Sequence, residues 1–340
     1  MADVLFQFPG GKSGQFTRIQ SIMPDHECWV EGFGGSGAMT LNKEPAVVDV
    51  YNDLDSEIVN FFIVYREAPE RLVSYLDKIP YSYSAYEDFV DAFYGEANEE
   101  RQENRLPGKP LTDNLIGPDD IAPKHVKRAA IFFTLRYTQF GAKYQGRSGF
   151  GRSKVQNGAE TFANATERLD EFIGCWDHVT IENVSYEKLI DAYDGSDTLF
   201  YFDPPYVGTE GYYRKSDFSH KQFCQDVQNI DGYFIISYDK VPKMLEDFYI
   251  TREESTNFID SGVKGEGKET HESLIMNFNP TEVQNFTTSG QVGIHDLKDD
   301  NNSDETDVFD DNGAEDDNNK QLFGDIDESD ENDGIKLFED

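Results

Sequence analysis

Short apolar runs alternate along the chain with segments whose apolar residues recur at helical spacing. The runs are continuous rather than alternating with polar residues, which is typical of strands buried on both faces of a sheet. Strands are predicted at 28–31, 46–50, 178–182, 198–202, 232–237 and 273–278, and helices at 54–66, 161–174 and 219–229. This alternation predicts an α/β fold with helices on both faces of the sheet.

One long segment breaks the alternation. Between residues 69 and 155 the spacing predicts helices at 69–78, 84–95 and 123–140 but no strand. We therefore expect a mainly helical subdomain at 56–155, inserted into a catalytic domain that comprises 1–55 and 156–282. Residues 283–340 are acidic, rich in Asn and Gly and poor in apolar side chains, which predicts a disordered tail.

The chain is strongly acidic, with 30 Lys and Arg against 66 Asp and Glu and a formal charge of −36. Residues 294–340 carry a net charge of −16, so the preceding 293 residues are also acidic, at −20. This balance excludes a generic basic nucleic-acid-binding protein. It fits either a halophilic source, where salt screens the self-repulsion, or ordinary acidity with an interaction tail. The apolar pairs Leu322–Phe323 and Leu337–Phe338 suit a docking segment for another protein, and the alternative is a solvated charge run.

No feature of the sequence predicts a membrane span, a signal peptide or a metal site. The chain contains no run of 18 apolar residues, and its first residues lack a basic flank followed by a long apolar core. The three cysteines, Cys28, Cys175 and Cys224, form no CxxC pair. We expect reduced thiols in a cytoplasmic protein.

A glycine cluster follows the first predicted strand. Gly32-Phe33-Gly34-Gly35-Ser36-Gly37 fits the G-x-G-x-x-G spacing of a strand–turn–helix, which lets a ligand approach the backbone closely. Asp53 lies 21 residues after Gly32, near the end of the next predicted strand, where a carboxylate can bind ribose hydroxyls. These features predict a pocket for a nucleoside-type ligand, either a dinucleotide or S-adenosylmethionine.

A second glycine-containing motif opens the chain. Phe8-Pro9-Gly10-Gly11-Lys12 resembles a phosphate-binding P-loop, but Phe6 stands where that motif requires a glycine. What remains is an aromatic residue, two glycines and a lysine, which can pair with a ligand carboxylate.

The sequence Asp203-Pro204-Pro205-Tyr206 directly follows the apolar run at 198–202. The two prolines make a rigid bend without backbone donors. Such a corner suits an exocyclic amino group on a planar base: Asp203 accepts one N–H, the Pro204 carbonyl accepts the other, and Tyr206 stacks on the ring. Drawing both hydrogens out of plane localises the nitrogen lone pair toward an electrophile. A base inside a duplex must be flipped out to reach this corner.

A basic island interrupts the acidic chain. Residues 121–159 contain eight Lys and Arg but no Asp or Glu, together with interleaved aromatics and glycines. Cations pair with phosphates, and an aromatic loop can enter a groove or fill the gap that a flipped base leaves. The expected DNA-binding residues are Lys124, Lys127, Arg128, Arg136, Phe140, Lys143, Arg147, Arg152 and Lys154.

Taken together, these motifs resemble the Dam-type DNA adenine-N6 methyltransferases, in which the cofactor motifs precede the recognition region and D-P-P-Y follows it. The resemblance covers residues 6–280 and extends to the closing strand that begins Glu272-Ser273. It implies a Rossmann-like sheet that binds S-adenosylmethionine, and a target-recognition region at 56–155 that binds double-stranded DNA.

The resemblance also implies the roles of individual residues. Catalysis would fall to Asp203, Pro204, Pro205 and Tyr206. The cofactor would be bound by Phe8, Gly10, Gly11, Lys12, Phe33, Gly34, Gly35, Asp53, Asn183 and Asp203, with Asp53 on the ribose and with Asn183 and Val184 bordering the adenine.

Two positions depart from the family's pattern. Gly32 replaces a proline, and Gln139-Phe140-Gly141 replaces an aromatic–Asn–Gly run in the recognition segment. Family precedent favours the recognition sequence GATC. Three biological roles stay open at this point: restriction–modification, replication marking, and protection of a virus from its host. The alternatives are a cytosine-N4 methyltransferase, a nicotinamide-dependent oxidoreductase based on the Gly32–Gly37 cluster, and a non-catalytic DNA-binding protein.

Overall fold

The computed structural model describes residues 3–8, 11–94, 121–140, 148–207, 218–257 and 268–283. Gly10, Lys143, Arg147 and the acidic tail from residue 284 onward therefore lie outside the described residues. The domain boundaries expected from the sequence stay a prediction.

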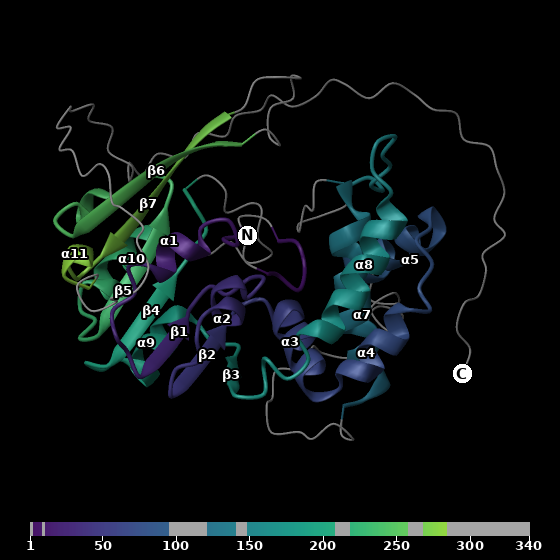
Figure 1. The fold of residues 1–340 in the computed structure, drawn as a ribbon, viewed down its shortest axis with the longest axis horizontal. Coiled ribbons are helices and arrows are strands. Elements are labelled where there is room, and N and C mark those ends of the chain that lie inside the picture. Colours follow the sequence, from purple (N-terminus) through teal and green to yellow (C-terminus); the bar gives the residue numbers. More distant parts are fainter. Residues whose placement is uncertain are drawn as a thin grey trace. The chain divides into compact units, whose positions relative to one another are not determined.

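A seven-stranded sheet forms the centre of the fold (Figure 1). Its strands are β1 (Cys28–Glu31), β2 (Val48–Asn52), β3 (Val179–Glu182), β4 (Thr198–Phe202), β5 (Tyr233–Tyr238), β6 (Tyr249–Asn257) and β7 (Lys268–Met276). They lie in the order β3-β2-β1-β4-β5-β7-β6. The first five strands of this order are parallel, and β7 pairs antiparallel with both β5 and β6. The predicted α/β fold is confirmed.

The sequence pattern located most strands but missed β6. This strand reads YITREESTN, so its polar residues give no apolar run. Its place at the sheet edge explains the composition, because charged side chains on an edge strand discourage pairing with another chain. The predicted strand at 46–50 begins at Val48 and ends at Asn52 in the structure, two residues later at each end.

Both faces of the sheet are covered. On one face, Trp29, Tyr201 and Leu274 pack against α1 (Phe16–Gln20) and α2 (Ala38–Asn42). On the other, Phe202 lies 5.4 Å from Phe223, between ring centroids. Phe223 belongs to α10 (His220–Val227), which also contacts α9 (Tyr186–Tyr193). All five residues of β4 are buried, as expected for a strand inside such a sandwich.

Helices gather beside the β3 end of the sheet (Figure 1). They are α3 (Ser56–Glu67), α4 (Pro69–Leu76), α5 (Tyr83–Tyr94), α7 (Pro123–Thr138) and α8 (Gly158–Glu171). Helix α3 is buried along residues 57–65, because it lies between the sheet and the other helices. Tyr51 and Ile181 of the sheet belong to the same hydrophobic cluster as these helices, so sheet and helices share one core. Two short helices, η4 (Lys243–Leu245) and α11 (Pro280–Val283), complete the described elements.

A buried ion pair joins α7 to the start of α3. The Arg128 Nε donates to Glu57 Oε2 at 2.5 Å, and its Nη2 pairs with Glu57 Oε1. Both side chains are nearly inaccessible to solvent. The sequence-based expectation that Arg128 contacts DNA phosphates is therefore wrong for this conformation, because its guanidinium is already used inside the protein.

Arg136 requires the same correction. Only 1% of the residue is exposed, and its guanidinium donates to the Tyr94 hydroxyl at 2.9 Å and to Gln139 Oε1 at 3.0 Å. These contacts tie the end of α7 to α5 and to the loop that follows, so Arg136 stabilises the helical layer rather than facing the solvent.

We predict that Arg128→Met lowers the free energy of unfolding by about 3–5 kcal/mol, because it leaves the buried Glu57 carboxylate without its cation. Urea denaturation would measure the change. The double variant Arg128→Met/Glu57→Gln should recover part of the loss. Lys124→Gln, in the exposed first turn of the same helix, is the control and should change stability by less than about 0.5 kcal/mol. If Arg128→Met and Lys124→Gln lowered the free energy of unfolding by similar amounts, that result would contradict the role assigned to the Arg128–Glu57 ion pair.

Candidate active site

A cavity of about 570 Å³ opens at the carboxyl ends of β1, β2 and β4. Strands β1 and β4 are neighbours, yet the chain leaves the sheet toward opposite sides after them, and ligands of doubly wound sheets bind in the crevice at this switch point. The lining includes the glycine turn after β1, Asp53–Asp55 after β2, Asp203 after β4, and Phe8 and Lys12 from the N-terminal segment.

The glycine turn fits closely against β2. A Cβ added at Gly34 would lie 2.1 Å from Tyr51 Cε2, so only glycine fits there without a shift of the backbone or the ring. Gly35 has a φ of +50°, which side-chain-bearing residues rarely adopt. The Tyr51 hydroxyl donates to the Gly35 carbonyl at 2.7 Å and fixes the turn. The sequence motif therefore has a structural reason at each of these two positions.

Asp53 holds the glycine turn from the end of β2. Its Oδ2 accepts the Gly35 N–H at 2.9 Å, and its Oδ1 accepts the Asp55 N–H at 2.7 Å. Asp55 in turn caps α3 by accepting the Glu57 N–H at 2.9 Å. Both carboxylates line the cavity, as the sequence predicted for Asp53.

Asn183 does not line the cavity, contrary to the sequence-based expectation. Its amide donates to the Asp53 carbonyl at 2.7 Å and accepts the Ser56 hydroxyl at 3.0 Å. It therefore braces the loop after β2 from outside. The walls on this side come from the residues that follow it, Val184, Ser185, Tyr186 and Glu187.

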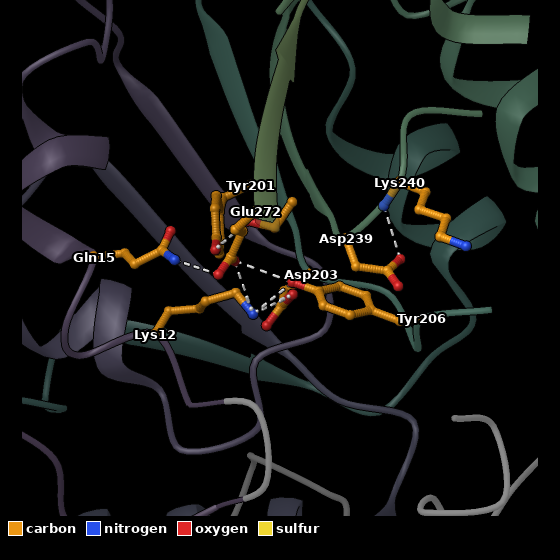
Figure 2. A network of polar contacts seen from close by, with 9 residues as sticks. Lys12, Gln15, Tyr201, Asp203, Tyr206, Asp239, Lys240 and Glu272 are labelled. Carbon is orange, nitrogen blue, oxygen red and sulfur yellow. Dashed lines mark hydrogen bonds and ion pairs between the residues drawn. The ribbon is translucent and has the colours of Figure 1, made fainter. Parts of the chain in front are cut away.

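The Lys12 ammonium lies at the centre of a polar network (Figure 2). Its Nζ is 2.9 Å from Asp203 Oδ1, 3.2 Å from Glu272 Oε1 and 2.9 Å from the Tyr206 hydroxyl. The Tyr206 hydroxyl donates to Glu272 Oε1 at 3.0 Å. The network thus joins the N-terminal segment, the D-P-P-Y corner and strand β7.

Burial and charge set the protonation of this network. Burial raises the pKa of Asp203 to about 6, with Lys12 opposing the shift and Glu272 adding to it. Burial alone would lower the pKa of Lys12, but Asp203 and Glu272 outweigh it and leave that pKa above its ordinary value. Lys12 is therefore a cation at neutral pH, and Asp203 is mostly ionised.

Glu272 is the member of the site that the sequence did not predict. It stands in β7, and Gln15 also donates to its Oε2. The resemblance had marked the strand that begins with Glu272 but gave this residue no role. No motif spacing connects it to Lys12, because 260 residues separate the two in the sequence.

The remaining residues of the corner are packed in place. Pro204 and Pro205 are buried, and Pro205 lines the cavity. The Tyr206 ring lies 6.1 Å from Tyr238, between centroids. Phe33 lines the cavity and packs edge-on against Phe218.

The exposed part of the basic island lies on α7 and on the segment after residue 148. Lys124, Arg152 and Lys154 are exposed, Lys127 is partly buried, and Phe140 is 67% exposed. The Arg152 guanidinium lies 4.8 Å from the Tyr83 ring centroid. Gln139 and Phe150 form an antiparallel β-bridge.

Among the helices that the structure describes, none has the length and apolar character needed to cross a membrane. Within the described ranges, no group of three or more His, Cys, Asp or Glu side chains could hold a metal ion.

Residues 8–267 match the family model of D12 class N6 adenine-specific DNA methyltransferases. The chain belongs to this family. A type II methyltransferase of Lactococcus lactis subsp. cremoris, M1.LlaDCHI, is 23% identical over 294 residues, which cover 80% of this chain and 94% of the relative. The modification methylase LlaI of Lactococcus lactis subsp. lactis is 22% identical over 293 residues, which cover 84% of this chain but 41% of that longer protein.

Membership of the D12 class confirms the resemblance drawn from the sequence motifs, and the sheet is consistent with the Rossmann-like fold of these methyltransferases. The matched residues include the glycine turn, the D-P-P-Y corner and helix α7. The family is adenine-specific, which favours that interpretation over the cytosine-N4 and nicotinamide-dependent alternatives.

Proposed function

We propose that this protein transfers a methyl group from S-adenosylmethionine to N6 of an adenine flipped out of duplex DNA. The observation that carries the proposal is the contact between Lys12 and Asp203, both of which line the cavity at the β1/β4 switch point. The cofactor motif and the substrate corner thus meet in one site.

The cavity has groups suited to each part of S-adenosylmethionine. The Asp53 and Asp55 carboxylates suit the ribose hydroxyls, which are hydrogen-bond donors. Val184 and the Phe33 ring offer apolar walls for the adenine. Phe8 and Lys12 lie where the amino-acid end would be held, with the Lys12 cation matching its carboxylate.

The D-P-P-Y corner suits the adenine amino group. Asp203 and the Pro204 carbonyl would each accept one N–H and leave the nitrogen lone pair directed at the cavity. When bound, S-adenosylmethionine would supply the methyl group to the N6 lone pair, and the S–C bonding pair would remain on sulfur in a neutral thioether. N6 would then release one proton, for which the Asp203 carboxylate at this corner would be an acceptor.

The exposed cations of the basic island support DNA binding by a chain that is acidic overall. Lys124, Arg152 and Lys154 would contact phosphates, and the exposed Phe140 ring suits insertion into a groove or a vacated base position. The names of the relatives favour a role as the modification enzyme of a restriction–modification system. The recognition sequence, with GATC as the family precedent, stays a prediction, as do the halophilic source and the docking role of the tail.

The direct test is transfer of labelled methyl groups from S-adenosylmethionine to duplex DNA, followed by digestion to nucleosides. N6-methyladenosine is expected as the product, and N4-methylcytosine would establish the alternative base. We predict that Asp203→Asn lowers kcat by about 10²–10⁴-fold, because the amino group loses its charged acceptor. Asp247→Asn, an exposed carboxylate in the turn before β6, is the control and should stay active.

The pH dependence should report on Asp203. Since burial raises the pKa of this carboxyl to about 6, kcat/KM should fall as the pH drops below that value and Asp203 becomes protonated. Lys12 stays charged throughout this range, because its pKa is raised above its ordinary value. A wild-type profile that stays flat down to pH 5 would contradict the assignment of Asp203 as acceptor.

We predict that Gly34→Ala weakens binding of S-adenosylhomocysteine about tenfold or more, measured by calorimetry. The added Cβ collides with the Tyr51 ring, so the turn beneath the ligand must shift. Overpacking of this kind costs about 1–3 kcal/mol, which corresponds to roughly tenfold or more in affinity. Gly14→Ala is the matched control, because nothing lies within 4 Å of a Cβ added there. Equal binding by the two variants would remove the glycine turn from the cofactor site.

Arg152→Gln should weaken binding to all duplexes alike and reduce the salt-dependence slope of log K by about 1, if this side chain neutralises one phosphate. Lys188→Gln, which removes an exposed cation from α9, should leave the slope unchanged. A change in sequence preference at constant slope would instead assign Arg152 to base recognition.

A further inference from the structure

Glu272 brings a second carboxylate to the Lys12 ammonium. Its Oε1 lies 3.2 Å from Lys12 Nζ and also accepts the Tyr206 hydroxyl at 3.0 Å. The amide of Gln15 donates to its Oε2. The Glu272 side chain is 15% exposed, and the Lys12 side chain is 8% exposed, so solvent provides little compensation for either charge. Glu272 does not line the cavity, although Asp203 and Lys12 do.

The geometry shows how hydrogen bonds are shared in this cluster. The Tyr206 hydroxyl has one hydrogen, for which Glu272 and Asp203 are both acceptors, so toward Lys12 it accepts through a lone pair. The ammonium has three hydrogens, and Asp203, Glu272 and Tyr206 provide three acceptors. With the two carboxylates ionised, Lys12 and its partners carry a net charge of −1.

This arrangement matters if the D-P-P-Y corner receives an amino group. In the structure, Lys12 occupies Asp203 Oδ1. An entering amino group adds a further N–H to this carboxylate, and where it takes over Oδ1 it displaces Lys12. If Asp203 were the only anion beside Lys12, its withdrawal would leave a buried ammonium without a counter-charge, which is strongly unfavourable. Glu272 removes that obstacle, because it remains in contact with Lys12.

We propose that Glu272 is a positioning residue for methyl transfer: it retains the Lys12 ammonium and the Tyr206 hydroxyl, so that Asp203 can exchange Lys12 for the amino group of the target base. This inference rests on the proposed function and assigns a role in it to a residue of β7. Glu272 acts through Lys12 and Tyr206, and it does not itself touch the base.

Glu272 also influences the ionisation of Asp203. The groups that face Asp203 are Lys12 from the N-terminal segment, Glu272 from β7, Glu31 from β1, Tyr238 from β5, and Tyr201 and Tyr206 from its own segment. Among them, Glu272 raises the pKa of Asp203 and Lys12 lowers it. Neutralising Glu272 should therefore lower the pKa of Asp203, because one anion is lost while the cation stays.

The test compares Glu272→Gln with Glu272→Asp in the full chain. The Gln variant keeps the shape and an oxygen acceptor but loses the charge. We expect its kcat to fall about 10- to 100-fold, the loss typical of removing a charged hydrogen-bond partner. The acid limb of its kcat/KM profile should move to lower pH. The Asp variant keeps the charge, so its acid limb should stay at the wild-type position and its kcat should lie closer to wild type.

Two controls separate this role from a structural one. Glu282→Gln removes an exposed carboxylate that bonds within its own turn of α11, and it should leave kcat and the pH profile unchanged. Calorimetric binding of S-adenosylhomocysteine to Glu272→Gln should match wild type, because Glu272 does not line the cavity.

A fall in kcat with an unmoved acid limb, equal losses in the Gln and Asp variants, or lost S-adenosylhomocysteine binding would each overturn the inference while leaving the proposed function intact. A wild-type protein that transfers no methyl group would overturn the proposed function, and this inference with it.

Discussion

The site depends on one buried cation held by two carboxylates from different parts of the chain. Lys12 belongs to the N-terminal segment, Asp203 directly follows the central strand β4, and Glu272 lies on the antiparallel strand β7. None of these segments is a sequence neighbour of another. A buried ammonium requires counter-charges, and this requirement fixes the N-terminal segment across the carboxyl edge of the sheet. The cavity consequently has a wall that the sheet alone would not supply.

A second buried ion pair connects this site to the helical layer. Arg128 of α7 binds the Glu57 carboxylate. The Glu57 N–H donates to Asp55, and the Asp55 N–H donates to Asp53. Asp53 then accepts the Gly35 N–H of the turn beneath the cavity. A continuous set of polar contacts therefore runs from the helix that carries exposed Lys124 to the proposed ribose site. It gives helix α7 and the glycine turn at Gly34 and Gly35 a common reference position.

The sequence predicted what depends on local pattern and missed what depends on distant charge. Continuous apolar runs located β1, β3, β4 and β5, and the glycine spacing located the turn at Gly34 and Gly35, where the structure provides a steric reason for each. The sequence did not predict a role for Glu272, because its partner Lys12 lies 260 residues away in the chain. The position of Asn183 after β3 predicts that it borders the cavity, but in the structure its side chain donates to the Asp53 carbonyl instead.

The basic island shows how a charge count can mislead. Its eight cations contrast with an acidic chain, and every one of them was expected to face phosphate. Arg128 and Arg136 lie on α7 among residues buried in the helical layer, where each meets a polar partner inside the protein. Helical periodicity does not separate Arg128 from Lys124, because residues four apart lie on the same face of a helix. The two differ in their position along α7: Lys124 lies in the exposed first turn, whereas residues 128–136 are all buried. The cations of a basic helix should therefore be assigned to DNA only after the buried part of the helix is known.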